Sequence, residues 1–235
     1  MVSEWIFELG GEQPQLAQAE LTELLATTDC ELAVTRQNEL QLRCILARPV
    51  PPGLLARLGM VRSGGVLAAT GSLEELEAAA TVINLDGARF AVRCAPGALE
   101  LQEVNKRLGA ILAKHGRVDL EQPTIIVRVF QGEKLQLLLE REATGYRRCL
   151  KHHLNRRPRF APVSLPPRLA RAMVNLALPS GVGKLLDPFC GTGGLLIEAV
   201  DCKLDASGSD LDGEMVDATR ENMLHFGFSA TLEQG

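Results

Sequence analysis

The stretch LLDPFCGTGGLLIEAV, residues 185–200, places an apolar strand, a glycine loop and an apolar helix one directly after another. Leu185 and Leu186 predict a strand that ends at Asp187, and a helix follows the loop at 191–194. A strand that enters a helix through such a loop presents backbone N–H groups at the helix N-terminus. Glycines let a ligand approach that backbone closely. The stretch therefore predicts a ligand-binding corner of an α/β sheet.

The alternation of strand and helix continues on both sides of this corner. We expect helices at 166–178, 193–202 and 213–227, and strands at 183–189, 206–212 and 229–235. This alternation is typical of a parallel, doubly wound sheet. After residue 165 only two complete strands and part of a third follow, which is fewer than such sheets usually have. We therefore expect the chain to be a fragment or a truncated product.

The first half of the chain predicts two smaller α/β units. The first follows the β-α-β-β-α-β order of a ferredoxin-like unit over about 80 residues, and Ser72 with Glu75 forms a capping box at its last helix. The second has a strand at 88–95, a helix at 99–116 and a hairpin of strands at 124–130 and 134–142. Residues 152–167 are rich in proline and basic side chains and have no apolar period, which indicates a linker.

The residues around the glycine loop favour S-adenosylmethionine over other ligands of such loops. A phosphate-binding loop needs a glycine where Leu178 stands, and a dinucleotide loop needs a third glycine where Leu196 stands. Asp187 can meet an ammonium, and Asp210, 23 residues later, can accept the hydroxyls of a ribose. The cofactor-binding candidates are Asp187, Pro188, Phe189, Cys190, Gly191, Thr192, Gly193, Gly194, Asp210 and Leu211.

Five segments carry a resemblance to a known family. LLDPFCGTGGLLIEA, GSDLDGEMVDATRENMLHFG and RPRFAPVSLPPRLARAMVNLA resemble the cofactor domain of the archaeal and eukaryotic tRNA guanosine-N2 methyltransferases. VNKRLGAILAKHGRVDLEQPTIIVRVF resembles a THUMP domain, which binds RNA, and FELGGEQPQLAQAELTELLA resembles the ferredoxin-like piece that precedes it. The family has Arg-Pro-Phe-Phe where this chain has Arg157-Pro158-Arg159-Phe160, so a stacking role for the first aromatic position does not carry over.

The resemblance implies a domain order and a reaction. The expected regions are an N-terminal ferredoxin-like region at 1–62, a THUMP domain at 63–150, a basic linker at 151–164 and a partial methyltransferase domain at 165–235. The implied reaction moves a methyl group from S-adenosylmethionine to the exocyclic amine of a tRNA guanosine, with position ten of the tRNA as a candidate. Two alternatives stay open: a non-catalytic tRNA-binding THUMP protein or remnant, and an rRNA guanine-N2 methyltransferase.

The basic charge is concentrated where RNA contact is expected. Residues 141–171 contain nine Lys or Arg and one acid, in a chain whose net charge is −4. Local charge decides where a polyanion docks. The expected tRNA contacts are Arg147, Arg148, Lys151, Arg156, Arg157 and Arg159.

One part of the implied chemistry is missing from the sequence. Enzymes that methylate exocyclic amines of this kind carry Asp or Asn followed by Pro-Pro and an aromatic residue, whereas Pro51-Pro52 and Pro166-Pro167 have neither flank. We therefore assign no catalytic residue. We expect the 235 residues alone to bind the cofactor weakly and not to transfer the methyl group.

Composition places further limits on function. The six cysteines form no Cys-x-x-Cys pair, and no third ligand stands near His152-His153 in the sequence, so we expect neither a disulfide framework nor a metal site. No apolar run reaches the length of a membrane span, and the N-terminus lacks the basic flank of a signal peptide. These features favour an enzyme located in the cytoplasm.

Overall fold

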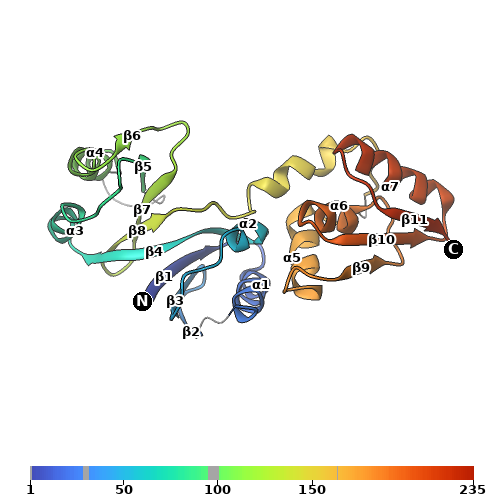
Figure 1. Cartoon of the computed structure of the whole chain (residues 1–235), viewed down its shortest axis with the longest axis horizontal. Coiled ribbons are helices and arrows are strands. Elements are labelled where there is room, and N and C mark those ends of the chain that lie inside the picture. The colour runs from blue at the N-terminus through green and yellow to red at the C-terminus, as the bar shows by residue number, and fades with distance from the viewer. Residues whose placement is uncertain (1, 29–31, 95–100, 163) are drawn as a thin grey trace.

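The computed structural model describes residues 2–28, 32–94, 101–162 and 164–235. Two β-sheets organise them, and a segment of short turns joins the two (Figure 1). The first sheet has eight strands in the order β2-β3-β1-β4-β8-β7-β5-β6, and the second has three in the order β11-β10-β9. None of the helices in these residues has the length and apolar content needed to cross a membrane.

The first half of the large sheet has the predicted ferredoxin-like topology. β3 pairs with both β1 and β2 in antiparallel fashion, and β1 pairs with β4 on its other side. This arrangement is a split β-α-β unit, in which β1 and β2 run parallel with β3 between them. The elements are β1 (Ser3–Leu9), α1 (Pro14–Ala26), β2 (Leu32–Asn38), β3 (Gln41–Leu46), α2 (Leu54–Arg57) and β4 (Val61–Gly71).

The second half continues the same sheet. β4 is long enough to serve both halves, because Val61–Val66 pairs with β1 and Val66–Gly71 pairs with β8. The helix expected from residue 99 is described from Leu101, and residues 95–100 lie outside the described residues. The elements are α3 (Leu73–Ala80), β5 (Arg89–Cys94), α4 (Leu101–Leu112), β6 (Arg117–Val118), β7 (Ile125–Gln131) and β8 (Leu135–Glu140).

The capping box expected at the start of α3 is confirmed. The Glu75 N–H donates to the Ser72 hydroxyl, and the Ser72 N–H donates to the Glu75 carboxylate. These two bonds satisfy donors that a helix N-terminus otherwise leaves unpaired. The sequence placed this helix at the end of the first unit, but in the structure it belongs to the second half, because Leu76 and Ala80 pack into the core around Phe90 and Leu108.

The connecting segment is more ordered than a solvated linker. It forms two short 3-10 turns, η1 (Arg148–His152) and η2 (Leu154–Arg156). Cys149, His152 and Arg157 are buried, so one side of the segment packs against the protein. The sequence shows no period here because 3-10 turns this short bury only isolated side chains. Val163, within the expected linker, lies outside the described residues.

The second sheet is parallel throughout. β9 (Lys184–Asp187) pairs with β10 (Asp205–Asp210), which pairs with β11 (Thr231–Gln234). Crossovers between parallel neighbours are right-handed, so successive steps in one direction place their helices on one face. Leu185 is buried beneath this helical layer, whereas Leu186 on the other face of β9 is 67% exposed. The helices are α5 (Pro167–Ala177), α6 (Gly194–Asp201) and α7 (Gly213–His225).

A buried carboxylate joins the two parts of the molecule. Glu20 of α1 accepts hydrogen bonds from the N–H groups of Gly59 and Met60, at 2.8 and 2.9 Å, and from the Asn175 side chain of α5 at 2.7 Å. Burial raises the pKa of Glu20, while these donors act in the opposite direction. Arg57 adds bonds from its guanidinium to the carbonyls of Leu178 and Pro179.

Candidate cofactor site at the glycine loop

The glycine loop lies at the carboxyl ends of β9 and β10. Gly208 of β10 pairs with Asp187 of β9. Asp210, two residues after Gly208, therefore lies at the same end of the sheet. The Gly191 N–H donates to Oδ2 of Asp210 at 2.9 Å, which ties the loop to the second strand. The two strand-end acids expected from the sequence therefore lie at one corner, on either side of the loop.

Asp187 is a buried acid, and the described residues give it no counter-charge. Its side chain accepts a hydrogen bond from the Phe189 N–H at 3.2 Å, and the residue is 7% exposed. Burial raises the pKa of Asp187, and the nearby negative charge of Asp210 raises it further. No Lys, Arg or His of the described residues forms an ion pair with it. A buried carboxylate of this kind is stabilised by an arriving cation.

Asp210 is half-buried and better supplied with donors. Oδ2 accepts from Gly191, and Oδ1 accepts from the Asp212 N–H at 3.1 Å. Each carboxylate oxygen can accept a second hydrogen bond. Asp210 can therefore accept two further donors, such as the two hydroxyls of a ribose.

The loop conformation requires glycine at two positions. Gly191 and Gly193 have φ angles of 52° and 81°, in the left-handed region that glycine adopts without strain. A Cβ on Gly193 would lie 2.9 Å from Cγ2 of Thr219, on α7. The Thr219 hydroxyl donates to the Gly191 carbonyl at 2.8 Å and so fixes the loop to α7.

The other expected cofactor residues divide by exposure. Cys190 and Thr192 are buried, and the Thr192 hydroxyl lies 2.9 Å from that of Ser164. Burial raises the pKa of the Cys190 thiol, which agrees with a packing role rather than a nucleophilic one. Phe189 and Leu211 are 79% and 77% exposed and flank the loop on its open side. Large apolar side chains at such positions offer surfaces for an adenine ring.

The arrangement selects against anionic cofactors at the strand ends. Two carboxylates beside the loop repel a phosphate, whereas a ligand with an ammonium and a diol finds a partner for each group. The geometry therefore fits a cationic nucleoside.

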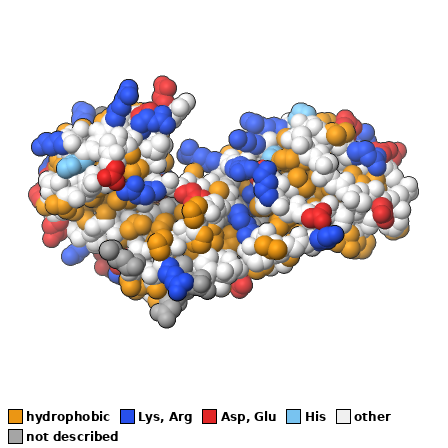
Figure 2. Space-filling model, in the orientation of Figure 1, with side chains coloured by type: hydrophobic (Ala, Val, Ile, Leu, Met, Phe, Trp, Pro, Cys, Tyr) orange, Lys and Arg blue, Asp and Glu red, His pale blue; other side chains and the backbone are white. Residues whose placement is uncertain are grey.

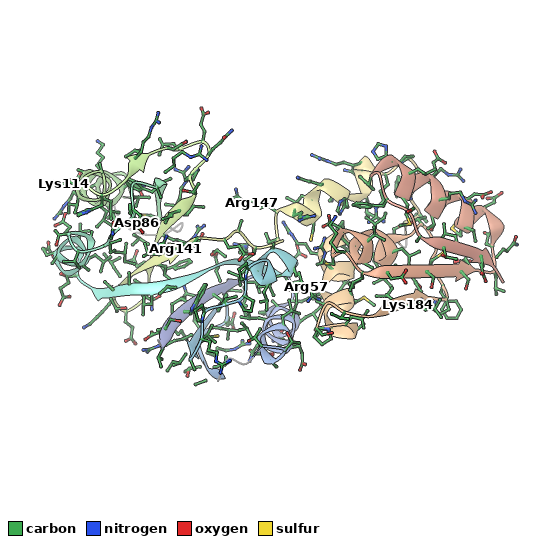
Figure 3. All side chains as sticks on the ribbon, viewed as in Figure 1. Arg57, Asp86, Lys114, Arg141, Arg147 and Lys184 are labelled. Atoms are coloured by element: carbon green, nitrogen blue, oxygen red, sulfur yellow. The ribbon has the colours of Figure 1, made fainter. Side chains whose placement is uncertain are left out.

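The expected RNA contacts lie on the connecting segment. The space-filling view shows a notch between the two ends of the molecule, with Lys and Arg side chains along it (Figure 2). Arg147 lies on the connecting segment at this notch (Figure 3). Arg147, Lys151 and Arg156 are exposed, so their charges are available to a polyanion.

The three other arginines expected to contact RNA already have partners inside the protein. Arg148 donates to the Asp201 carboxylate, with Nε 3.1 Å from Oδ1. Arg159 forms an exposed ion pair with Glu221 at 3.6 Å. Arg157 is 5% exposed, and its Nε donates to the His152 carbonyl. Its guanidinium therefore does not reach the surface, where a phosphate contact would need it.

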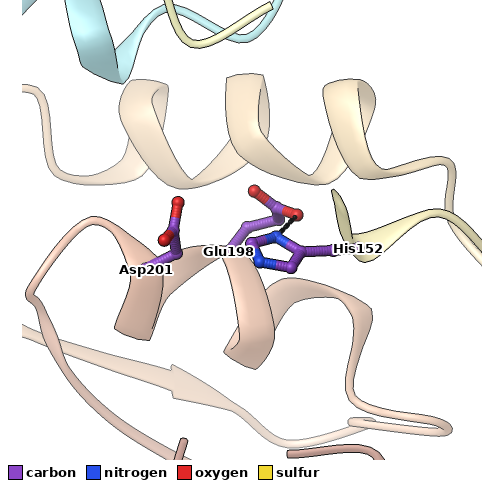
Figure 4. Close-up of side chains that lie close together, drawn as sticks. All are labelled: His152, Glu198 and Asp201. Atoms are coloured by element: carbon purple, nitrogen blue, oxygen red, sulfur yellow. Dashed lines mark hydrogen bonds and ion pairs between the residues drawn. The ribbon is translucent and has the colours of Figure 1, made fainter. Parts of the chain in front are cut away.

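Behind the glycine loop lies a buried ionic cluster, which the sequence did not reveal. His152 Nδ1 lies 2.9 Å from Glu198 Oε1, and Asp201 is one turn further along α6 (Figure 4). Three such groups within 4.8 Å of one another resemble a metal-ligand set. Arg171, 1% exposed, however pairs with both carboxylates and supplies the neutralising charge. We therefore assign this cluster to fastening α5 and the connecting segment onto α6.

Two relatives of known name align in sequence with most of the chain. The family model described as "RMKL-like, methyltransferase domain" matches residues 155–235. A tRNA (guanine(10)-N2)-dimethyltransferase of Methanothermobacter thermautotrophicus is 32% identical, over 94% of this chain and 68% of that protein. The enzyme of the same name from Pyrococcus abyssi is also 32% identical, over 94% of this chain and 67% of that protein.

Solved structures of methyltransferase relatives align with nearly the whole chain and have a similar fold. The crystal structure of TrmN from Thermus thermophilus aligns with a TM-score of 0.62 and 26% identity, covering 99% of this chain and 73% of that one. A possible methylase from Clostridium difficile aligns with a TM-score of 0.55 at 16% identity, covering 100% of this chain and 75% of that one. The second likeness concerns the fold alone.

Proposed function

This chain belongs to the family of tRNA guanine-N2 methyltransferases, and we propose that its glycine loop binds S-adenosylmethionine for methylation of a tRNA guanosine. The observation that carries the proposal is the pair of acids, Asp187 and Asp210, on either side of the loop. The names of the relatives favour guanine at position ten as the base that is modified.

The residues of the corner match the functional groups of the cofactor. S-adenosylmethionine supplies a methyl group that is activated by the positive charge of its sulfonium. Asp187 would accept from the ammonium of the methionine end, and Asp210 would accept from the ribose hydroxyls. Phe189 and Leu211 would cover the apolar parts, including adenine. The loop backbone is held by Thr219 and by Asp210 before the ligand arrives, so little ordering is needed on binding.

The exposed cations of the connecting segment would hold the tRNA. Phosphate contacts position a nucleic acid without reading its sequence. Arg147, Lys151 and Arg156 lie between the sheet that resembles a THUMP unit and the cofactor corner. RNA bound along the notch would therefore contact both parts of the molecule.

A second candidate, RNA binding without methyl transfer by these 235 residues, is favoured by one observation. Both Pro-Pro pairs lie at helix starts, and neither has Asp or Asn before it or an aromatic residue after it. Pro166 and Pro167 begin α5, and the Pro51 carbonyl accepts from the Leu54 N–H at the start of α2. The positioning of the amine, which contributes much of the rate in such reactions, has no residue assigned here.

Nucleoside analysis of cellular tRNA tests the function. The gene is deleted, and the tRNA and rRNA of both strains are digested and analysed by mass spectrometry. We expect N2-methylated guanosine to disappear from tRNA, at position ten, and to return when the gene is restored. Loss from rRNA alone would support the rRNA enzyme instead. Unchanged modification of both RNAs would support the non-catalytic alternative.

A further inference from the structure

Arg168 is stacked on the ring of Tyr146 at the junction of the two sheets. Its guanidinium carbon lies 3.5 Å from the centre of the ring, and its Nε donates to the Tyr146 carbonyl at 3.1 Å. A cation over an aromatic face at this distance is attracted by the ring. Arg168 belongs to α5, beside the second sheet, whereas Tyr146 comes shortly after β8 of the first. The stack therefore lies where the two halves of the molecule meet.

The ring of Tyr146 is itself held in place. A Cβ on Gly10 would lie 3.2 Å from Cε2 of Tyr146, so the backbone that follows β1 packs against the ring. A Cβ on the preceding residue, Gly145, would lie 2.5 Å from the carbonyl oxygen of Ala56, so the chain passes closely over α2. The ring on which the Arg168 guanidinium is stacked is therefore fixed to the first half of the molecule.

The charge of Arg168 has no acidic partner within the described part of the chain. Its Nε is bonded to a carbonyl, and no carboxylate of those residues pairs with Nη1 or Nη2. Glu142, the one acid among residues 141–171, accepts instead from the Gly53 N–H at 2.9 Å, at the start of α2. Arg62 also lies over the ring, but it pairs with Glu8 at 3.5 Å. Arg168 therefore combines a fixed orientation with an unneutralised charge.

We propose that Arg168 binds a phosphate of the tRNA backbone and fixes the position of the RNA relative to the cofactor corner. This role rests on the proposed function and adds an oriented contact to it. The two Nη groups of a guanidinium match two oxygens of a phosphate. Arg147, which directly follows Tyr146, lies at the notch, so the stack lies beside the surface proposed to hold the tRNA (Figure 3).

Orientation distinguishes Arg168 from the exposed cations of the connecting segment. Arg147, Lys151 and Arg156 are exposed, and none of them is stacked on a ring of the described residues. They attract a polyanion through their charge, and they lose side-chain freedom when a phosphate fixes them. Arg168 is half-buried and already ordered by the ring and the carbonyl, so it pays less of this cost on binding.

Substitutions at Arg168 and Tyr146 separate charge from orientation. Binding of a fluorescein-labelled, unmodified tRNA transcript to the 235-residue chain is measured by anisotropy at several salt concentrations. The variants are Arg168→Met, Arg168→Lys and Tyr146→Leu. Arg147→Lys and Tyr146→Phe are the matched controls, since the first changes a cation that is not stacked and the second keeps the ring. Thermal melting followed by circular dichroism checks that each variant is folded.

We expect R168M to bind tRNA about tenfold more weakly and to lower the slope of log K against log salt by about 1, as for one lost phosphate contact. R168K keeps the charge and therefore the slope, but without the stacked, planar fork it binds about two- to fivefold more weakly. Y146L gives the same result as R168K, because Arg168 then keeps its charge and loses its orientation. R147K and Y146F bind like the wild type.

Other results would overturn this role of Arg168 and the proposed function separately. If R168M keeps the wild-type affinity and slope while Arg147→Ala lowers the slope, tRNA does not contact Arg168, and the stack only fastens the connecting segment. If R168K and Y146L bind like the wild type, orientation has no part in the contact. If R168M does not fold, R168K and Y146L decide between these results. If the folded wild type binds no tRNA, the proposed function fails and this role fails with it.

Discussion

Asp187 and Asp210 flank one loop but have different environments. Asp187 is buried with a single N–H donor, whereas Asp210 is half-buried with two. The pKa of Asp187 is therefore raised, and its ionised form gains most from a cation. These acids were predictable from the sequence, because parallel strands bring residues at their carboxyl ends to one edge. The burial of Arg157 was not, since its neighbours in sequence are exposed and the helix that it packs against, α6, comes more than thirty residues later.

Removing the charge of Asp187 should weaken cofactor binding and stabilise the free protein. Asp187→Asn keeps an acceptor for the Phe189 N–H but cannot neutralise an ammonium. We expect the affinity for S-adenosylmethionine to fall by roughly 10- to 100-fold, as for a lost charged hydrogen bond. The exposed Asp205→Asn serves as the control in calorimetry. Equal affinities of wild type and D187N would contradict the assigned role of Asp187.

The raised pKa of Asp187 also predicts how the stability and the cofactor affinity of this site depend on pH. The folded state holds the Asp187 proton more tightly than the unfolded state, so stability falls as the pH rises from the unfolded pKa through the raised one. Cofactor affinity should change in the opposite direction, rising with pH as Asp187 ionises. Titrations from about pH 4.5 to pH 7, where the ligand ammonium stays charged, measure both trends. D187N should show neither trend at this site, and a wild-type affinity that is flat with pH would exclude Asp187 as the ammonium partner.

Among the elements, β4 is the strand that the two halves of the large sheet share. Its eleven residues pair with β1 at one end and β8 at the other, so the two units expected from the sequence share one sheet. The sequence predicts each unit from local periods, but a strand shared between them looks like any other apolar run. Gly64, in the middle of β4, leaves room for the buried ring of Phe7.

A methyl group at Gly64 should destabilise the sheet. A Cβ there would lie 2.3 Å from Cδ1 of Phe7, which is fully buried and cannot move aside without repacking the core. We expect Gly64→Ala to lower the free energy of unfolding by about 1–3 kcal/mol, as for overpacking in a core. Urea denaturation measures the change. Gly11→Ala is the control, because nothing lies within 4 Å of its Cβ position. Similar stabilities for both variants would show that Phe7 is not tightly held.

At the scale of the whole molecule, buried polar groups fix the two sheets relative to each other. Glu20 and Asn175 are 155 residues apart in sequence, yet they bond across the contact between α1 and α5. The charged cluster of Arg171, Glu198 and Asp201 fastens the connecting segment in the same way. Such contacts cannot be predicted from local sequence, because no period or motif links the partners. Their effect is that the exposed cations of the connecting segment keep a fixed position relative to the cofactor corner.

Those cations should determine how tRNA binding depends on salt. We expect Arg147→Ala and Lys151→Ala to weaken tRNA binding and each to lower the slope of log K against log salt by about 1, as for the loss of one phosphate contact. Fluorescence anisotropy with labelled tRNA at several salt concentrations measures the slope. Lys184→Ala is the control, since Lys184 is 87% exposed and lies away from the notch (Figure 3). A control that lowers the slope as much as R147A would show that the binding follows overall charge.

The first measurement to make is whether the glycine loop binds S-adenosylmethionine. The 235-residue chain is labelled with nitrogen-15, and its amide signals are followed by NMR during titration with S-adenosylmethionine and, separately, with ATP. We expect saturable shifts at Gly191, Thr192 and Gly193 with S-adenosylmethionine and no comparable shifts with ATP. A folded chain whose loop signals do not respond to S-adenosylmethionine, or respond to ATP instead, would contradict the assignment of this loop as the cofactor site.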